Sequence, residues 1–389
     1  MYEVCLKKGE ERRILRGEPW VYANEVQKIN GEGKQGEIAR VVSADGRFVA
    51  LGYINHLSKI LVRVLSYKEE PIDRDFFFRR IKEANDYRLA LGYKNNYRAV
   101  FAESDRLPAL IVDKYGDYLS CQFLSLGMEK RKEMIVDILV EIFSPKGIYE
   151  RSDVAVRKKE GLEEKKGLLY GDVPDLIEIE ENGLKMLVDV KNGQKTGYFL
   201  DQKENRDDLK CYAAGKTVLD CFCNEGGFSL CAAKYGAKSV TAVDVSERAL
   251  DLVNKNAALN GFENIIKTEC ADVFEYLRVC RREKKNFDLI VLDPPAFTKS
   301  ADTVKEGIRG YKDVNIQALK LLKKGGVLIT CSCSQHLTVK FFTDMLKDAL
   351  YESGVSAKLM ELRIQGKDHA AFAGNDESLY LKVAALYVF

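Results

Sequence analysis

A ten-residue stretch in the second half of the chain contains residue types that can bind a small polar ligand. Asp220 to Ser229 reads DCFCNEGGFS, and it begins inside an apolar run that predicts a buried strand. Gly226 and Gly227 have no Cβ atom, so the backbone at the start of the following helix can approach a ligand closely. The stretch lacks the GxGxxG pattern of dinucleotide sites. Its acid and paired glycines suit a nucleoside that carries an amino acid and no phosphate.

Further carboxylates stand where the next predicted strands end. Asp244 ends the second strand, at a spacing suited to a carboxylate that accepts both hydroxyls of a ribose. Asp272 follows the third strand, where a carboxylate can accept from an adenine amino group, and Asp293 follows the fourth. Each acid taken alone could be a helix N-cap. Because acids recur at successive strand ends, we expect a ligand site at this edge of the sheet.

The elements that must position these residues follow a regular order after about residue 190. Apolar strands alternate with amphipathic helices, and repeated units of this kind predict a mostly parallel sheet with helices on both faces. The expected strands are 217–222, 239–245, 265–271, 287–292, 326–331 and, as one or two strands, 379–389; the expected helices include 226–235 and one capped by Ser246. The predicted fold class is therefore α/β and Rossmann-like.

The N-terminal half predicts two smaller parts. Residues 1–70 read as short strands separated by turns, with a hairpin turn at Ala44-Asp45-Gly46. The segment 71–188 predicts a central α+β domain. Its expected elements are a helix from Ile72, a hairpin of 109–113 with 118–123, one helix whose face runs from Met128 to Ile142, and a solvated charged loop at 157–166. The expected domains are thus 1–70, 71–188 and 189–389.

Composition restricts the class of protein. No apolar run is long enough to span a membrane, and the N-terminus lacks a secretory h-region, so we expect a cytoplasmic protein. The ten cysteines form no CxxC pair, which favours reduced thiols. The three histidines (His56, His336 and His369) lie outside metal-ligand spacing with cysteines, so no metal is expected. A net charge of +2 neither indicates nor excludes nucleic-acid binding, and the oligomeric state stays open, with a homodimer compatible.

The C-terminal half resembles class I methyltransferases, and the whole chain resembles the ribosomal large-subunit methyltransferase I family. The likeness begins with Lys8-Gly9 and Gly17 to Glu25, which resemble the opening of that family's RNA-binding PUA domain. Asn192 to Gln202 (NGQKTGYFLDQ), followed by Arg206, resembles its most distinctive signature. Ser332-Cys333-Ser334 and Asp368-His369 match two further motifs, although Ala370 stands where proline is usual.

The resemblance implies methylation of carbon 5 of a cytosine in 23S rRNA with S-adenosylmethionine as cofactor. The residues implied to hold or border the cofactor are Asp220, Asn224, Gly226, Gly227, Asp244, Asp272 and Asp293. The residues implied to close the pocket are Tyr198, Asp201, Gln202 and Arg206. Arg206 could offer a fork to a carboxylate, and the plainer interpretation of this residue is a surface salt bridge.

Cytosine C5 is a poor nucleophile, and addition of a thiolate at C6 makes it reactive. Cys333 is the candidate nucleophile, and Asp293 is the candidate acid that protonates or hydrogen-bonds N3. A thiol of ordinary pKa is mostly protonated at neutral pH, and a nearby carboxylate protonates it further, so something must offset this effect. The plainer interpretation of Cys333 is a small buried apolar residue. Cys331 is expected to point to the opposite side, into the core.

One segment leaves the reacting atom open. Asp293-Pro-Pro-Ala-Phe297 lacks the second cysteine that two-cysteine RNA cytosine-C5 enzymes carry there, because Ala296 occupies the position. It also looks like the Asn/Asp-Pro-Pro-Tyr/Phe loop of nitrogen methylators, in which Phe297 would stack on a planar base. Methylation of guanine N7 or of an exocyclic amine is therefore the alternative. A methyltransferase for small molecules or proteins and a non-catalytic RNA-binding factor are function classes that fit the chain less well.

Overall fold

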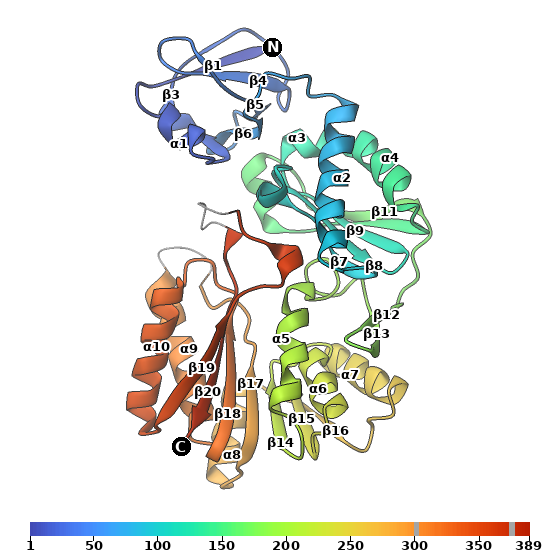
Figure 1. The fold of residues 1–389 in the computed structure, drawn as a ribbon, viewed down its shortest axis with the longest axis vertical. Coiled ribbons are helices and arrows are strands. Elements are labelled where there is room, and N and C mark those ends of the chain that lie inside the picture. The colour runs from blue at the N-terminus through green and yellow to red at the C-terminus, as the bar shows by residue number, and fades with distance from the viewer. Residues whose placement is uncertain (299–302, 373–377) are drawn as a thin grey trace. The chain divides into compact units, whose positions relative to one another are not determined.

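The computed structural model describes residues 1–298, 303–372 and 378–389, and the chain folds into two compact units (Figure 1). Unit 1 comprises residues 1–177, 188–200 and 367–378. Unit 2 comprises residues 178–187, 201–366 and 379–389. Within the described residues, no helix combines the length and the apolar character needed to cross a membrane.

The first sheet of unit 1 has six strands in the order β2-β6-β5-β4-β1-β3. Its elements are β1 (Tyr2–Leu6), α1 (Glu11–Leu15), β2 (Trp20–Tyr22), β3 (Val26–Asn30), β4 (Ile38–Val42), β5 (Phe48–Ile54) and β6 (Ile60–Ser66). Buried Val, Leu and Ile side chains from these strands form their own core. The turn predicted at residues 44–46 is confirmed, because it joins β4 to its antiparallel partner β5.

The second sheet of unit 1 has the order β11-β10-β9-β8-β7 (Figure 1). Its elements are α2 (Arg74–Ala90), β7 (Asn96–Phe101), β8 (Leu110–Tyr115), β9 (Tyr118–Phe123), α3 (Leu126–Glu129), α4 (Lys132–Phe143), β10 (Gly147–Ser152) and β11 (Lys165–Gly171). The predicted hairpin is confirmed as β8 and β9. The three predicted domain boundaries stay a prediction.

Two details of this part differ from the sequence prediction. Met128 lies on the separate short helix α3, so the single helix expected from Met128 to Ile142 is wrong. The charged stretch 157–166 is also not uniformly solvated, because Arg157 is buried. Its guanidinium group donates to the carbonyl oxygens of Phe123 and Glu163 and to Glu129 Oε2 at 3.0 Å. The charge pattern alone did not show that a buried turn needed these donors.

Unit 2 contains a seven-stranded sheet of order β16-β15-β14-β17-β18-β20-β19 (Figure 1). The strands are β14 (Thr217–Cys221), β15 (Ser239–Asp244), β16 (Ile266–Cys270), β17 (Phe287–Leu292), β18 (Leu322–Ser332), β19 (Ala357–Arg363) and β20 (Lys382–Val388). The helices are α5 (Lys203–Asp207), α6 (Gly227–Lys234), α7 (Glu247–Leu259), α8 (Val273–Arg282), α9 (Val304–Leu319) and α10 (Val339–Ser353). A hairpin of β12 (Ile177–Glu181) and β13 (Leu184–Val188) precedes them. The predicted α/β class is confirmed.

The register of this sheet brings several strand ends to one level. Cys221 in β14 pairs with Val243 in β15 on one side and with Leu292 in β17 on the other. Five neighbouring strands of the sheet are parallel to one another, in the order β16, β15, β14, β17 and β18. Their carboxyl ends therefore meet at one edge. Ligands of open α/β sheets bind at this edge, where the chain reverses its strand order.

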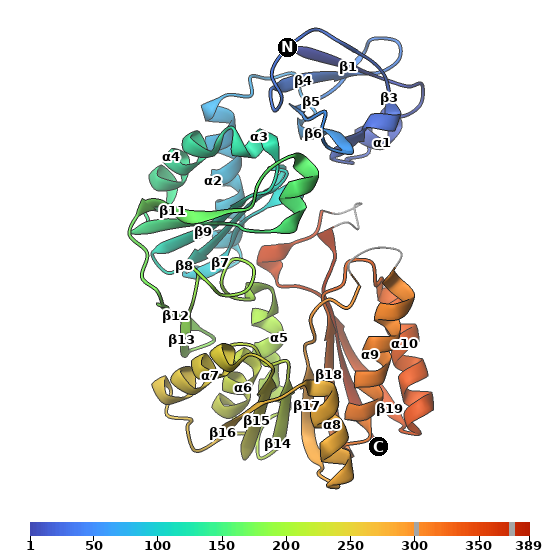
Figure 2. The same ribbon diagram turned by 180° about the vertical axis from the view of Figure 1, so that it is seen from behind.

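The C-terminal strand β20 runs antiparallel between β18 and β19. This pairing sets Lys382 directly opposite Ser332, so the start of β20 lies beside the carboxyl end of β18. The sequence predicts β20 but misses β19, whose charged and exposed residues give no clear strand pattern. Helices α8, α9 and α10 pack on the strands in one apolar core, as Figure 2 shows from behind.

Candidate active site

The loop after β14 has an unusual backbone. Phe222, Asn224 and Gly226 all have positive φ values, of 61°, 47° and 83°. A Cβ atom at position 226 would lie 3.0 Å from a methyl group of Val253, so glycine is required there by both conformation and space. The amide of Cys223 donates to the carbonyl oxygen of Val243 at 3.1 Å. The loop is therefore tied to the end of β15.

Asp220 lies at the base of this loop and is completely buried. Its Oδ2 accepts from the Ser229 hydroxyl at 2.6 Å, whereas no hydrogen-bond donor among the described residues reaches its Oδ1. Burial raises the pKa of Asp220 to about 7, and the negative charges of Asp293 and Asp244 add to the effect. A buried carboxyl with an unused oxygen and acidic neighbours favours a cationic or hydrogen-bond-donating ligand.

Asp244 holds the loop and the next helix together. Its Oδ2 accepts from the amide of Asn224 at 3.0 Å, and its Oδ1 accepts from the amide of Ser246 at 3.0 Å. A carboxylate has about four acceptor positions, so two remain for hydroxyl donors. Ser246 caps α7 by accepting from the amide of Ala249, which confirms the predicted cap.

Asp272 follows β16 and caps α8. Its Oδ1 accepts from the amide of Glu275 at 3.0 Å, and its side chain is exposed. The N-cap interpretation considered for each acid therefore applies to Asp272. A cap uses one oxygen for one N–H group, so it is compatible with a further ligand contact.

The carboxyl group of Asp293 is oriented by residues of the signature. Gln202 donates its Nε2 to Asp293 Oδ1 at 3.0 Å, and the Gln202 Oε1 accepts from Asn205 at 2.8 Å. Asp201, the preceding residue, accepts from the hydroxyl of Tyr380 at 2.5 Å. Asp201, Gln202 and Asn205 are all buried. The second half of the signature is therefore a fixed support within unit 2.

Two more residues of the signature have partners of their own. Arg206 forms a buried, two-pronged ion pair with Glu181, with Nε 2.8 Å from Oε1 and Nη2 3.0 Å from Oε2. The Arg206 guanidinium group, which was expected to bind a ligand carboxylate, thus already binds the carboxylate of Glu181. Tyr198 belongs to unit 1, where its backbone N–H and carbonyl oxygen both bond to the hydroxyl of Tyr115. The matched pair Asp368 and His369 also lies buried in unit 1.

Phe297 is packed among aromatic rings. Its ring centroid lies 4.6 Å from that of Tyr311, 5.9 Å from that of Phe274 and 6.4 Å from that of Phe222. The ring is half-buried against the core of unit 2. These contacts hold the Asp-Pro-Pro segment in place, and the base stacking expected from the sequence stays a prediction.

Cys333 lies immediately after β18 and is half-buried. Its Sγ approaches the carbonyl oxygen of Pro294 at 3.9 Å, which places the thiol beside the segment that begins with Asp293. Cys331 is fully buried, and burial together with the charge of Asp293 raises its pKa well above the ordinary value. The complete burial of Cys331 agrees with the core position expected from the sequence, and the direction of its side chain relative to Cys333 stays a prediction.

Lys382 is a residue of this neighbourhood that the sequence interpretation missed. Its side chain is 1% exposed, and its Nζ donates to the carbonyl oxygen of Ser334 at 2.6 Å. A signal was present in the sequence, because a single lysine stands at the start of the otherwise apolar run 381–386 (LKVAAL). A lysine in such a run indicates either an edge position or a buried charge with a purpose.

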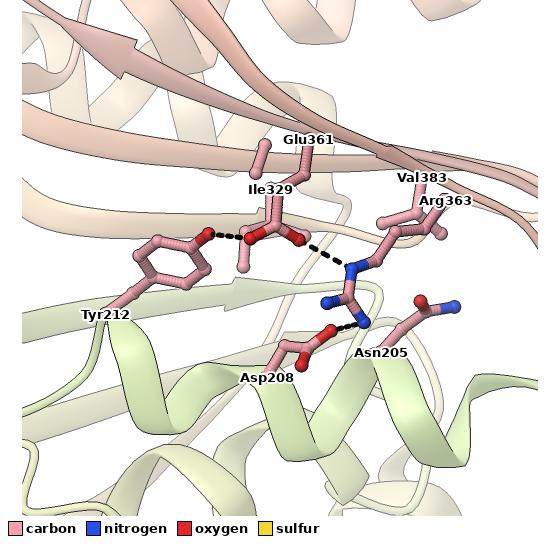
Figure 3. Close-up of a pocket in the computed structure, with 8 residues that line it drawn as sticks. Asn205, Asp208, Tyr212, Ile329, Glu361, Arg363 and Val383 are labelled. Carbon is pink, nitrogen blue, oxygen red and sulfur yellow. Dashed lines mark hydrogen bonds and ion pairs between the residues drawn. The ribbon is translucent and has the colours of Figure 1, made fainter.

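A separate hollow of unit 2 lies on the face of the sheet over the middle of β18 and β20 (Figure 3). The Tyr212 hydroxyl donates to Glu361 at 2.7 Å, and Arg363 contacts both Glu361 and Asp208. The charged groups in this hollow thus pair with one another and fasten η5 (Asp208–Cys211) to β19. This network is structural, and the carboxyl edge remains the candidate site.

The residues at the carboxyl edge fit S-adenosylmethionine by their chemistry. The buried carboxyl of Asp220 and the half-buried carboxyl of Asp293 suit a cationic group, and Asp244 retains acceptor positions for ribose hydroxyls. The Gly226 turn brings backbone rather than side chains to the start of α6. This donor set carries no cluster of basic side chains of the kind that a phosphate requires.

Comparison with known proteins gives consistent matches. A family model described as S-adenosylmethionine-dependent methyltransferase matches residues 157–357, and a PUA-like domain model matches residues 4–67. Ribosomal RNA large subunit methyltransferase I of Shewanella amazonensis is 46% identical over 386 residues, and that of Aeromonas salmonicida is 43% identical over 386 residues. Each alignment covers 97% of both chains.

Solved structures share the fold over the whole chain. A protein from Streptococcus mutans described as an S-adenosylmethionine-dependent methyltransferase matches with a TM-score of 0.85 at 24% identity, covering 100% of both chains. A methyltransferase crystallised with S-adenosylhomocysteine matches with a TM-score of 0.87, also at 24% identity and full coverage. The protein is thus an S-adenosylmethionine-dependent methyltransferase, and it belongs to the ribosomal RNA large subunit methyltransferase I family.

Proposed function

We propose that this enzyme methylates carbon 5 of a cytosine in large-subunit ribosomal RNA and that Cys333 is its nucleophile. The observation that carries the proposal is the position of this thiol, half-buried at the carboxyl end of β18 and 3.9 Å from the carbonyl oxygen of Pro294. The ribosomal substrate class is supported by the names of the relatives that match 97% of the chain. S-adenosylmethionine supplies the methyl group when it is bound.

The proposed chemistry uses the thiol and the neighbouring carboxyl. The Cys333 thiolate forms a bond to C6 of the cytosine, and the electron pair of the C5–C6 double bond moves to C5. Carbon 5 then takes the methyl group as its bond to the sulfonium sulfur breaks, with the electron pair of that bond left on sulfur, and the C5 proton later passes to water. The C6–S bond breaks as the double bond re-forms, so the thiolate is regenerated. Every atom is accounted for, and no oxidant or reductant is needed.

Asp293 has the acid's role at N3 of the base. A proton held by this carboxyl, or a hydrogen bond from it, stabilises the negative charge that addition to C6 places on the ring. Gln202 donates to Asp293 Oδ1 at 3.0 Å, so the carboxyl group is oriented before the base arrives.

The cofactor residues are proposed on the same chemistry. Asp244 accepts from the ribose hydroxyls, Asp272 from the adenine amino group, and Asp220 and Asp293 border the methionine part. Asn224, Gly226 and Gly227 provide the backbone of the loop against which the cofactor lies. Asp201 and Gln202 support this wall from within unit 2, and Arg206 does so through Glu181. Tyr198 completes the set proposed from the family signature.

The nitrogen alternative is less well supported. It needs an aromatic ring at position 297 that can stack on a flipped base. The Phe297 ring is half-buried against Tyr311, Phe274 and Phe222. The nitrogen alternative also gives no role to the half-exposed Cys333 thiol beside the Asp-Pro-Pro segment.

Nucleoside mass spectrometry of ribosomal RNA tests the proposal. A strain that lacks this protein should lose a 5-methylcytidine from its large-subunit RNA, and the wild-type protein should restore it. Cys333→Ala should not restore it, whereas Cys270→Ala, which alters an exposed cysteine at the end of β16, should. Loss of a methylated guanine or of a methylated amine in the deletion strain would instead establish the nitrogen alternative.

A further inference from the structure

Lys382 is a buried ammonium group with only neutral hydrogen-bond partners. Its Nζ donates to the carbonyl oxygens of Ser334 at 2.6 Å and of Tyr380 at 2.7 Å, and its side chain is 1% exposed. Within the described part of the chain, no carboxylate forms an ion pair with it. Burying an unpaired charge costs several kcal/mol, by order of magnitude, so such a group requires an explanation.

The position of Lys382 relates it to the candidate nucleophile. Register places Lys382 opposite Ser332, the residue before Cys333, and its bond to the Ser334 carbonyl holds the residue after Cys333. Ser334 is fixed at two further points, since its amide donates to Ser332 Oγ at 3.3 Å and its own Oγ bonds to the Tyr311 hydroxyl at 2.8 Å. The lysine therefore helps to fix the backbone on both sides of the thiol.

The electrostatic interaction between the two side chains also links Lys382 to Cys333. Burial lowers the pKa of Lys382 to about 8, and the opposing influence comes from Cys333, which raises it. An interaction that favours the charged lysine when the thiol is ionised must equally favour the thiolate when the lysine is charged.

One of the neighbouring titratable groups around Cys333 acts in the opposite direction. Asp293 precedes the Pro294 carbonyl that the thiol approaches, Cys331 stands two residues earlier on β18, and Tyr311 on α9 bonds to Ser334, the residue after the thiol. Burial and, to a smaller extent, the charge of Cys333 raise the pKa of Tyr311 to about 12. The raised pKa values leave Tyr311 and Cys331 uncharged at neutral pH, so the charge that disfavours a thiolate there is that of Asp293. Lys382 supplies the positive charge that offsets it.

We propose that Lys382 is a positioning residue that stabilises the Cys333 thiolate through its buried ammonium group and fixes the turn that carries this thiolate. This inference rests on the proposed function, in which that thiolate attacks the base. The ammonium group touches neither the base nor the methyl group, and the proton of the thiol leaves to solvent.

The reactivity of the thiol toward iodoacetamide tests the inference without RNA or cofactor. The alkylation rate of Cys333 is followed against pH by mass spectrometry of its peptide in the full-length protein. Lys382→Gln keeps N–H donors for the two carbonyl oxygens and removes the charge, and Lys382→Met removes both. Each should move the midpoint of the Cys333 profile upward by about one pH unit and slow alkylation about tenfold at neutral pH. The exposed Cys211 and Cys270 serve as internal controls and should not change.

Turnover gives the second readout. In both neutral variants kcat should fall about tenfold at neutral pH and recover as the pH rises, because more thiolate forms. KM for S-adenosylmethionine should stay unchanged. Lys382→Arg keeps a positive charge and should give an alkylation midpoint between those of the wild type and Lys382→Gln. Two folded neutral variants with the wild-type Cys333 midpoint would overturn the inference.

The outcomes separate this inference from the proposed function. The alkylation profile reports only on the thiol, so a raised midpoint supports the role of Lys382 whether or not cytosine is the target. If Cys333→Ala retained full turnover, the proposed function would fail while the alkylation result stood. An unchanged alkylation midpoint, together with loss of turnover in Cys333→Ala, would overturn the role of Lys382 and leave the proposed function intact.

Discussion

Asp244→Ala tests the assignment of the ribose contact. The structure shows both oxygens of this carboxylate accepting backbone N–H groups, from Asn224 at 3.0 Å and from Ser246 at 3.0 Å. Two of about four acceptor positions therefore remain for two ribose hydroxyls. A hydrogen bond to a charged group contributes about 1.5–3 kcal/mol, so losing even one weakens binding roughly 10- to 150-fold. We expect affinity for S-adenosylmethionine to fall by more than about tenfold.

Isothermal titration calorimetry measures this loss, and circular dichroism checks that the variant is folded. Loss of the acceptor for two loop amides should also lower stability by about 1–3 kcal/mol, which leaves the fold intact. Asp251→Ala, an exposed acid on α7, is the matched control and should bind like the wild type. A folded Asp244→Ala variant with unchanged affinity would remove this residue from the cofactor site.

Three further predictions follow from particular contacts. Glu181→Gln should destabilise the protein by about 3–5 kcal/mol in denaturant titrations, because the Arg206 charge then stays buried without the Glu181 carboxylate. Adding Arg206→Met should restore much of the lost stability, and equal stability of Glu181→Gln and the wild type would contradict this prediction. The folded-state pKa of Asp220 is raised to about 7, so this carboxyl binds more protons in the folded than in the unfolded chain, and wild-type stability should fall as the pH rises from about 4 to about 7. Asp220→Asn should lack this contribution, and parallel curves of stability against pH for the two proteins would refute the prediction. Deletion of residues 1–70 should leave cofactor affinity unchanged while RNA affinity drops with a shallower salt dependence, and normal RNA binding by the truncated enzyme would exclude a docking role.

The sheet of unit 2 could be predicted because its signals are local. Apolar runs such as 217–221 and the cap at Ser246 depend on neighbouring residues in the sequence, and the structure confirms both. The positions of Asp244 and Asp293 at strand ends follow directly from those runs. Local pattern therefore located the candidate site along the chain.

The partners of the candidate residues could not be predicted in this way. Arg206 pairs with Glu181, 25 residues earlier, and Lys382 bonds to Ser334, 48 residues earlier, so both contacts depend on tertiary packing. The ring of Phe297 faces three aromatic rings that come from separate segments. A sequence pattern gives the type and order of residues, whereas these contacts depend on how the helices cover the sheet.

The central claim is that Cys333 bonds covalently to cytosine, and a mechanism-based trap tests it most directly. An RNA substrate with 5-fluorocytosine at the target position should form a stable adduct with the enzyme and S-adenosylmethionine, because fluorine cannot leave as the proton does. The adduct should appear as a shifted band on a denaturing gel, and peptide mass spectrometry should place it on Cys333. Cys331→Ala, which changes the buried neighbouring thiol, should still form it, and Cys333→Ala should form none and turn over no RNA. Full turnover by Cys333→Ala, with no adduct in the wild type, would contradict the account.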